Sequence, residues 1–324
     1  YTGGGCPHIL AEPQRTNLFP YSENASTWSN SLWTTTDDYA ISPDGTQNAF
    51  RGVSTSNASL LYISGLGSAG ENTISIYAKS NTGSDQKFRF FANGNTTQST
   101  DQTATQEWQR FEYTETYSFI TWGLLGASVS GTNDILFYGM QHEVGSYPTS
   151  LIPTNGEAGG VTRNQDIFTR DGIGSLINST EGVLFVEMAA LSNDSTYRGI
   201  SLNKNDGTAN NRIVIFFWNA SNELLIRSTI NGVTKINETI NLVSETDYNK
   251  IAISYKLNNW KIYVNGSLEA AITNASALVF PSGTLDNLSF DSTLNSNPFY
   301  GKVKQLQVYD TALTDEQLLQ LTGE

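Results

Sequence analysis

The feature that most constrains the fold is a hairpin signal in the second half of the chain. Residues 223–230 and 233–240 are two strand-like stretches that only Asn231 and Gly232 separate. Asn-Gly is the preferred connection for a two-residue type I′ β-turn, whose twist matches that of antiparallel strands. A chain with this pattern is expected to contain antiparallel β-sheet.

The same pattern continues towards the C-terminus. Residues 251–255, 260–264 and 267–270 are three further apolar-rich stretches, separated by Asn258-Asn259 and by Asn265-Gly266. Short connections of this kind join strands that are neighbours in a sheet. They predict a three-stranded meander.

The first half of the chain also predicts short strands. Residues 73–77 alternate strictly between apolar and polar side chains, and similar stretches cover residues 87–90 and 108–117. Residues 135–140 are apolar on both faces, which is typical of a strand in the middle of a sheet. Their spacing favours a β-sandwich of the jelly-roll type.

A single short helix is expected near the C-terminus. Residues 301–309 alternate as a strand, and Thr314 then precedes Gln317 by three residues, which is the spacing of a capping box. Leu318 and Leu321 would share the inward face of this helix.

Composition excludes several classes of function. The formal net charge is -13 with 18 Lys and Arg, and without a basic cluster a nucleic-acid partner is not expected. A single cysteine excludes an intramolecular disulfide and a cysteine-rich zinc site. No apolar run approaches the ~18 residues that span a bilayer, so no membrane partner is expected.

The start of the sequence suggests a piece of a longer protein. The chain begins at Tyr1 rather than at a methionine, within a Gly-rich stretch, and it shows no signal-peptide pattern. We expect an N-terminal anchoring region to precede it.

Two domains are expected from the length of 324 residues. Residues 1–154 are predicted to form a jelly roll, and residues 180–324 a second sandwich. Residues 155–179 include Gly-rich stretches with few side chains to pack, and are predicted to be a linker.

The second half resembles the laminin-G-like and concanavalin A-like lectin and glucanase sandwich. The resemblance rests on residues 250–266 and, at the expected separation, on residues 301–321. The Trp-His that often opens the first motif is Tyr248-Asn249 here. The match spans about residues 180–324 and implies a concanavalin A-like sandwich with a short C-terminal helix.

Two segments flank the first domain. The first flanking segment is residues 12–18 (EPQRTNL), and the second flanking segment is residues 143–154 (EVGSYPTSLIPT). Neither has helical or strand periodicity, and the prolines of both favour extended backbone. They resemble a signature of structural proteins in tailed bacteriophages, in which such segments bracket a β domain.

The first domain also resembles the jelly-roll carbohydrate-binding modules. The strand around Trp108-Gln109-Arg110-Phe111 and a final apolar strand that ends in Gln141-His142-Glu143 carry this similarity, which covers roughly residues 10–150.

Catalytic chemistry finds little support in the sequence. Histidine-based catalysis has only His8 and His142 to use, and a hydrogen-bonding role is the better account of both. Glycosidases need two carboxylates, but the candidate strand 183–188 carries only Glu187. We expect the chain not to be an enzyme.

Glycan binding needs exposed aromatic faces and neutral hydrogen-bonding groups rather than titrating residues. The candidates are Trp28, Trp33, Tyr39, Trp122 and Trp218, whereas Trp108 and Trp260 are predicted to be core. No cofactor is expected. Both resembled carbohydrate-binding families often hold a structural calcium, but the acidic loop residues are too generic to assign it: Asp37, Asp38, Asp44, Asp286 and Asp291.

The resemblances together imply a non-catalytic virion structural protein of a tailed phage, a head or tail fibre or appendage. It would lie on the virion surface, outside the cell, form a homotrimer, contact other virion proteins and bind host-surface glycans. Two alternatives stay open: a glycan-degrading enzyme on the same folds, and a secreted bacterial adhesion module without sugar affinity.

Overall fold

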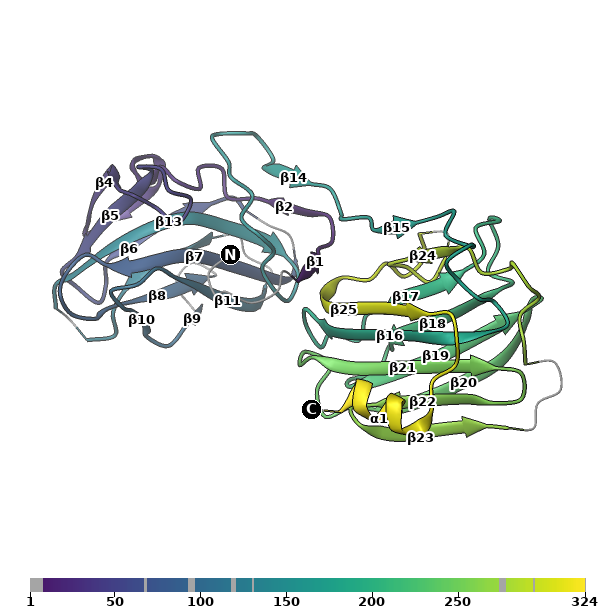
Figure 1. Ribbon diagram of the computed structural model, residues 1–324. Helices are drawn as coiled ribbons and strands as arrows, with labels where there is room; N and C mark the ends of the chain where they lie inside the picture. Colours follow the sequence, from purple (N-terminus) through teal and green to yellow (C-terminus); the bar gives the residue numbers. More distant parts are fainter. Residues whose placement is uncertain are drawn as a thin grey trace. The chain divides into compact units, whose positions relative to one another are not determined.

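The computed structural model describes residues 8–66, 69–92, 97–117, 121–129, 131–273, 278–293 and 295–323. Over these residues the chain consists of β-strands with one single-turn 3-10 helix, η1 (Ala25–Thr27), and one short α-helix, α1 (Asp315–Thr322) (Figure 1). Two sets of packed antiparallel sheets each enclose a separate hydrophobic core. The predicted all-β fold of two sandwiches with a C-terminal helix is confirmed.

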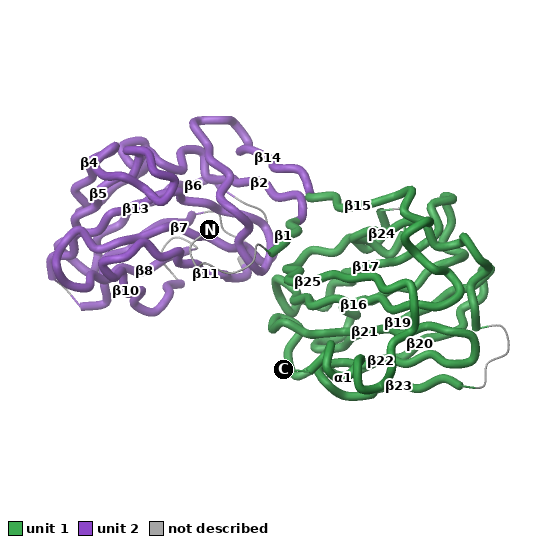
Figure 2. Tube along the Cα trace, viewed as in Figure 1, with its two compact units in different colours: residues 1–12, 166–324 green, residues 13–165 purple. Residues whose placement is uncertain are grey.

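The boundaries of the two units differ from the predicted 1–154, 155–179 and 180–324. Unit 1 comprises residues 1–12 and 166–324, and unit 2 comprises residues 13–165 (Figure 2). Unit 2 is therefore inserted after the first strand of unit 1. The reason is long-range strand pairing, which joins an N-terminal strand to the last strand of the chain.

Unit 1 is a sandwich of two six-stranded sheets. The front sheet contains, in order, β1 (Ile9–Ala11), β25 (Gly301–Tyr309), β16 (Glu181–Ala190), β21 (Asn249–Lys256), β22 (Trp260–Val264) and β23 (Ser267–Ile272). The back sheet contains, in order, β15 (Thr169–Arg170), β24 (Asn287–Ser289), β17 (Arg198–Asn203), β18 (Arg212–Phe217), β19 (Glu223–Ile230) and β20 (Val233–Asn241).

The turns of unit 1 follow the sequence signals. Asn231 and Gly232 join β19 to β20 with φ of 49° and 77°, and Asn265 and Gly266 join β22 to β23 with φ of 48° and 78°. Positive φ at both central residues is the mark of a type I′ turn. The predicted hairpin and meander are both present.

The two sheets of unit 1 bury one core between them. Alternate residues of β16 and β18 face each other across it, among them Leu184, Val186, Ile213 and Ile215, all fully buried. Each such side chain contributes about 1.5–3 kcal/mol by leaving water. The remaining alternate residues point to the outer faces of the sandwich.

Helix α1 covers the outer face of the front sheet, towards the viewer in Figure 1. Its Leu318 is fully buried against Phe185 of β16 and Tyr263 of β22. Thr314 and Gln317 form the predicted capping box. The outer face of the back sheet lies on the far side of the unit.

Unit 2 is also a sandwich. One sheet contains, in order, β11 (Gln109–Tyr117), β7 (Gly70–Ser80), β13 (Asn133–Val144), β5 (Ala49–Ser54) and β4 (Trp33–Ala40). The other contains, in order, β10 (Gln102–Ala104), β8 (Gln86–Ala92), β12 (Thr121–Gly126), β6 (Leu60–Ser64) and β3 (Ser29–Ser31), with β9 (Thr97–Gln98) beside β8. Strand β13 lies in the middle of its sheet, as its apolar pattern predicts.

Both flanking segments contribute residues to strands, contrary to the expectation that neither would, and β13 extends through Val144 of the second flanking segment. Residues Arg15–Asn17 form β2, which pairs with β14 (Val161–Arg163) of the predicted linker. Beyond this pair, Glu12 N donates to Asp166 Oδ2 and Asp166 N donates to Glu12 O, both at 2.9 Å. Local periodicity does not reveal backbone pairing between segments about 150 residues apart. This explains why the domain boundaries and the strand at Arg15–Asn17 were not predicted.

Candidate functional site

Three of the predicted glycan-binding residues are buried in the core of unit 2. Trp28, Trp33 and Trp122 are 5%, 6% and 1% exposed. Trp28 packs edge-on against Phe19 and Phe50, so its ring is enclosed by other rings. These three tryptophans cannot offer a ring face to a sugar, and the prediction is not supported for them.

Tyr39 is 44% exposed on β4. The guanidinium of Arg51 lies 5.2 Å from its ring centroid and also forms a salt bridge of 2.6 Å with Asp134. The Tyr39 ring is thus exposed, and Arg51 packs against it.

Trp218 lies on the outer face of the back sheet of unit 1. It directly follows β18, in which side chains alternate between the core and this outer face. Its neighbours on the outer face are Val214 and Phe216 on β18 and Leu225 on β19, which are buried as a small separate cluster. This cluster is the apolar floor of a surface on which Trp218 is partly exposed.

Two further side chains frame Trp218. The ring centroid of Tyr197 lies 4.5 Å from that of Trp218, edge to face, and the guanidinium of Arg227 lies 5.5 Å from the indole centroid. A cation at this distance is attracted by the ring quadrupole. We call Tyr197, Trp218 and Arg227, with Arg212, the back-sheet surface.

Polar side chains of the loop before β17 fix the position of Tyr197 through a salt bridge and a hydrogen bond. Asp194 forms a salt bridge of 2.5 Å with the buried Arg198, and Asn193 Nδ2 donates to Ser221 Oγ at 2.6 Å. Burial would raise the pKa of Asp194, but the hydrogen bond and charge of Arg198, together with further hydrogen bonds, outweigh it and lower this pKa. Tyr197 is therefore held next to Trp218 before any ligand arrives.

Arg212 begins β18 on the same face. Its Nη1 donates to Ser292 O and to Thr293 Oγ1, the latter at 3.2 Å. Burial and then the charge of Arg227 lower the pKa of Arg212. The exposed Asn237 and Thr239 of β20 add neutral hydrogen-bonding groups at the edge of this surface.

A buried polar ladder supports the other end of the back sheet. Asn203 Nδ2 donates to Ser201 Oγ at 2.7 Å and to Ser289 Oγ at 3.0 Å, and Asn287 Nδ2 donates to Asn203 Oδ1 at 3.1 Å. These groups satisfy one another, so the ladder stabilises the pairing of β17 with β24.

Unit 2 carries an acidic hollow of about 430 Å³. Its lining residues are Glu23, Asn24, Asp37, Asp38, Pro153, Thr154, Asn155 and Glu157. Asn48 Nδ2 donates both to Glu23 Oε2 at 3.2 Å and to Asp44 Oδ2 at 3.1 Å, which holds these two carboxylates close together.

The two carboxylates titrate differently. Burial and the charge of Asp44 raise the pKa of Glu23. Burial would also raise the pKa of Asp44, but hydrogen bonds from Thr46, Ser42 and Tyr138 outweigh it and hold this pKa well below its usual value. Divergent pKa values in neighbouring carboxylates are a feature of acid–base pairs.

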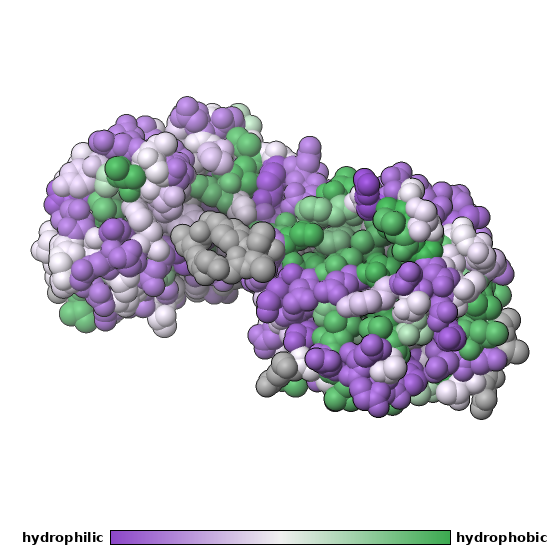
Figure 3. Space-filling model, viewed as in Figure 1, coloured by the Kyte–Doolittle hydropathy of each residue, from purple (hydrophilic) through white to green (hydrophobic). Residues whose placement is uncertain are grey.

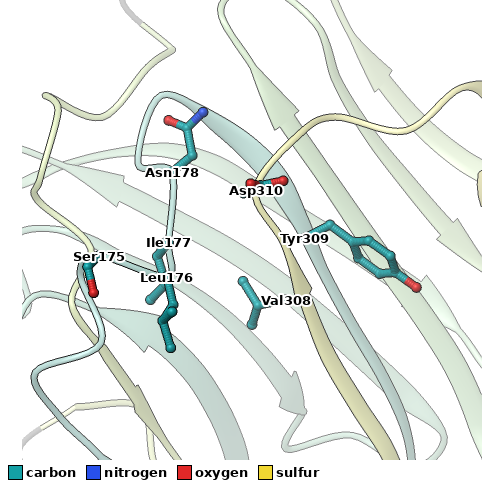
Figure 4. A pocket seen from close by; sticks show the side chains of 7 residues that line it. All are labelled: Ser175, Leu176, Ile177, Asn178, Val308, Tyr309 and Asp310. Atoms are coloured by element: carbon teal, nitrogen blue, oxygen red, sulfur yellow. The ribbon is translucent and has the colours of Figure 1, made fainter.

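A second hollow, of about 490 Å³, lies in unit 1 beside the end of β25 (Figure 4). Leu176, which is 71% exposed, and Val308 line it, and Asn178 and Tyr309 point away from them. Figure 3 shows apolar side chains on the surface of unit 1 between β24 and β25. The polar groups do not converge here as they would in a sugar site.

The two flanking segments form a buried polar network in unit 2. Asn17 Nδ2 donates to Met140 O and Ile152 O, and Asn17 Oδ1 accepts from the N–H groups of Phe19 and His142. Glu143 accepts from Thr149 N at 2.9 Å and from Thr149 Oγ1 at 2.5 Å. Asn17 and Glu143 of the two flanking segments thus have a structural role.

No group of three His, Cys, Asp or Glu side chains within the described ranges is arranged to hold a metal ion. The structural calcium therefore stays without an assigned site. In the same ranges, no helix combines the length and apolar character of a membrane span.

The sequence missed Tyr197, Arg212 and Arg227 as site residues. Alternation along residues 212–218 could have placed Arg212 on the face of Trp218. The positions of Tyr197 and Arg227 depend on strand pairing and on the loop before β17, which alternation does not report.

Several solved structures are similar to part of the chain. A carbohydrate-binding module of family 40 from the Ruminococcus gnavus intramolecular trans-sialidase is 17% identical, with a TM-score of 0.39, and the match covers 48% of this chain and 99% of that chain. The leech intramolecular trans-sialidase is 19% identical over 48% of this chain and 28% of that chain, with a TM-score of 0.37. Sheep galectin-11 is 7% identical, with a TM-score of 0.31, and the match covers 44% of this chain and 97% of that chain.

No curated protein sequence matches the chain significantly. A family comparison does give a match within unit 1, from β16 into α1. Residues 184–319 match the family model of the concanavalin A-like lectin/glucanases superfamily, as the sequence motifs of this region predict.

Proposed function

We propose that the chain is a non-catalytic glycan-binding protein and that it binds sugar on the back-sheet surface of unit 1. The observation that carries this proposal is the pair of partly exposed rings, Tyr197 and Trp218, held over an apolar floor within a region that matches a lectin family model. Aromatic rings pack against the C–H faces of sugars, and the neighbouring amides and hydroxyls bind sugar hydroxyls.

We further propose that the protein is a head or tail fibre or appendage of a tailed phage, lies on the virion surface and acts as a homotrimer. The flanking segments 12–18 and 143–154 support this proposal through their resemblance to phage structural proteins. Repeated weak sites in a trimer would raise the avidity for a glycan-covered surface.

A glycan array on the full chain tests the sugar-binding proposal. The wild-type chain is expected to bind a defined set of glycans, and Trp218→Ala is expected to weaken this binding about five- to thirtyfold, because a ring contact of this kind contributes on the order of 1–2 kcal/mol. Tyr39→Ala removes an exposed ring from unit 2 and is the matched control. Equal losses in both variants, or no binding by a folded wild-type chain, would contradict the proposal.

Antibody labelling of the parent virion tests the phage proposal. Label on a fibre or appendage in negative-stain images is expected, and label on bacterial cell surfaces in the absence of phage particles would instead support a bacterial adhesion module.

The acidic hollow of unit 2 favours one second candidate, a glycan-degrading activity. Retaining glycosidases use two carboxyl groups about 5–5.5 Å apart with pKa values that differ. Glu23 lines the hollow, and Asp44, which is not among its lining residues, accepts a hydrogen bond from the same Asn48 amide as Glu23. Release of reducing sugar from an array-positive glycan, lost in Glu23→Gln, would establish this activity. Glycan binding without any release would exclude it for that glycan.

A further inference from the structure

Two arginines are neighbours on the back-sheet surface. The register of β18 and β19 places Arg212 opposite Thr229, and Val214 opposite Arg227. Arg212 and Arg227 are therefore diagonal neighbours on one face, at a spacing within reach of long side chains. The charge of Arg227 contributes to the lowered pKa of Arg212, which indicates that the two cations repel each other.

Neither arginine is neutralised within the described part of the chain. No carboxylate there forms a salt bridge with Arg212 or Arg227. Burial and the charge of Arg227 lower the pKa of Arg212, and the charge of Asp291 acts in the opposite direction without outweighing them. The oxygens of Asp291 already accept hydrogen bonds from Ser289 Oγ and from the N–H groups of Thr293 and Asn295.

Several guanidinium donors are also unused. Arg227 Nε donates a hydrogen bond to Asn237 Oδ1 at 3.0 Å, and the two Nη groups of Arg227 have no hydrogen-bond partner in the described ranges. Arg212 Nη1 donates hydrogen bonds to Ser292 O and Thr293 Oγ1. The buried Nε of Arg212 has no hydrogen-bond partner in the described ranges. In a chain of net charge -13, two adjacent arginines that form no salt bridge among the described residues are an unusual local feature.

The guanidinium groups lie next to the aromatic rings. Arg227 is 5.5 Å from the Trp218 centroid and 5.9 Å from the Phe216 centroid, and Tyr197 borders Trp218 on the same surface. A ligand that contacts these rings would place its substituents within reach of the two cations. A negatively charged substituent there would remove the repulsion between them and gain charge-assisted hydrogen bonds.

Resting on the proposed function, we propose that the back-sheet surface selects acidic glycans. The sugar ring contacts Tyr197 and Trp218, and its carboxylate or sulfate group binds between Arg212 and Arg227. Neutral sugars lack this group and bind only through the ring contacts.

Matched pairs of glycans test the selectivity on the full chain. The pairs differ in the charged group alone: glucose against glucuronate, galactose against galactose 6-sulfate, and the methyl ester of sialyllactose against sialyllactose. The dissociation constant of each is measured by titration in 50 mM and 300 mM salt. At least one acidic member is expected to bind about tenfold or more tightly than its neutral partner, and the preference is expected to shrink at high salt.

Two variants and a control assign the effect to the arginines. Arg212→Gln and Arg227→Gln are each expected to abolish the preference for the acidic member, measured as the ratio of the two dissociation constants, and the affinity for the neutral member is measured beside this ratio. Lys302→Gln removes the same charge from the exposed side of the front sheet and is expected to change neither.

The outcomes separate the two proposals. Equal affinity for acidic and neutral members overturns the acidic selectivity and leaves the proposed glycan binding intact. A preference that survives in both arginine variants also overturns it. If no member of any pair binds a folded chain, both proposals fail. Preference for the uronate, the sulfate or the sialoside identifies the acidic group.

Discussion

At the scale of single residues, the flanking segments are explained by a few buried polar side chains. Asn17 is fully buried and uses its amide for four hydrogen bonds with backbone groups of residues 19, 140, 142 and 152. A hydrophobic residue here would leave those backbone groups unpaired. The need for an amide of this size accounts for asparagine at this position.

Asn17→Ala is expected to lower the free energy of unfolding of unit 2 by about 2–4 kcal/mol, because it leaves several buried backbone groups unsatisfied. Urea denaturation followed by tryptophan fluorescence measures the change. The control is Asn30→Ala, in which the lost bonds to Trp33 involve an exposed asparagine, and it should cost under about 1 kcal/mol. Equal effects of the two variants would contradict the account.

His142 predicts a pH dependence. It is fully buried beside Trp122, with ring centroids 5.0 Å apart, and burial lowers its pKa to about 4 from an ordinary value of 6.5. The unfolded chain binds the proton more readily, so the stability that neutral His142 confers is complete above about pH 6.5 and is lost as the pH falls towards 4. The loss is on the order of 3 kcal/mol.

Melting temperatures of the wild type and of His142→Gln, measured between pH 7 and pH 4.5, test this dependence. The wild type is expected to lose more stability than the variant over this range, since only it carries the titrating imidazole. Parallel curves would show that His142 does not titrate differently in the folded and unfolded chains.

At the scale of elements, local signals were sufficient where local chemistry decides the structure. The type I′ turn at Asn231-Gly232 and the capping box of α1 involve neighbouring residues only, and both were predictable. The pairing of β1 with β25 joins Ile9 to Val303, and no local pattern contains that information. The domain boundaries were therefore misplaced at both ends of unit 2.

The same limit applies to the candidate site. Trp28, Trp33, Trp122 and Trp218 are all tryptophans within or next to short strands, and the sequence did not separate them. Exposure depends on which face of a sheet meets the second sheet. Trp218 is partly exposed because it lies on the outer face of the back sheet, and the other three point into a core.

Thr314→Ala tests the capping of α1. The variant loses the hydrogen bond from Gln317 N to Thr314 Oγ1, and a cost of about 1 kcal/mol is expected. Thr314→Ser retains a hydroxyl and is expected to cost a few tenths of this value. Thermal unfolding of unit 1 measures both. If serine and alanine cost the same, the cap does not stabilise the helix.

At the scale of the whole molecule, unit 2 is an insertion with its own core. Residues 13–165 contain both sheets of the sandwich and the network between the two flanking segments. This architecture predicts that the fragment 13–165 folds alone. A dispersed amide NMR spectrum and a cooperative melt are the expected results, and a disordered spectrum would show that unit 2 depends on unit 1.

Unit 1 is expected to behave differently when cut. The fragment 166–324 lacks β1, whose Ala11 is fully buried in the core of unit 1 and whose backbone pairs with Gly301 to Val303 of β25. This fragment should melt at a lower temperature than unit 1 in the full chain, and addition of residues 8–12 as a peptide is expected to restore part of the difference.

The most direct test of the central claim is a fluorine NMR titration of the full chain labelled with 5-fluorotryptophan. The six tryptophans give separate probes, assigned by single Trp→Phe variants. The array-selected glycan is expected to shift the Trp218 resonance and to leave those of the buried Trp28, Trp33 and Trp122 in place. A shift of any of these three with Trp218 unchanged would place the ligand in unit 2 and contradict the account.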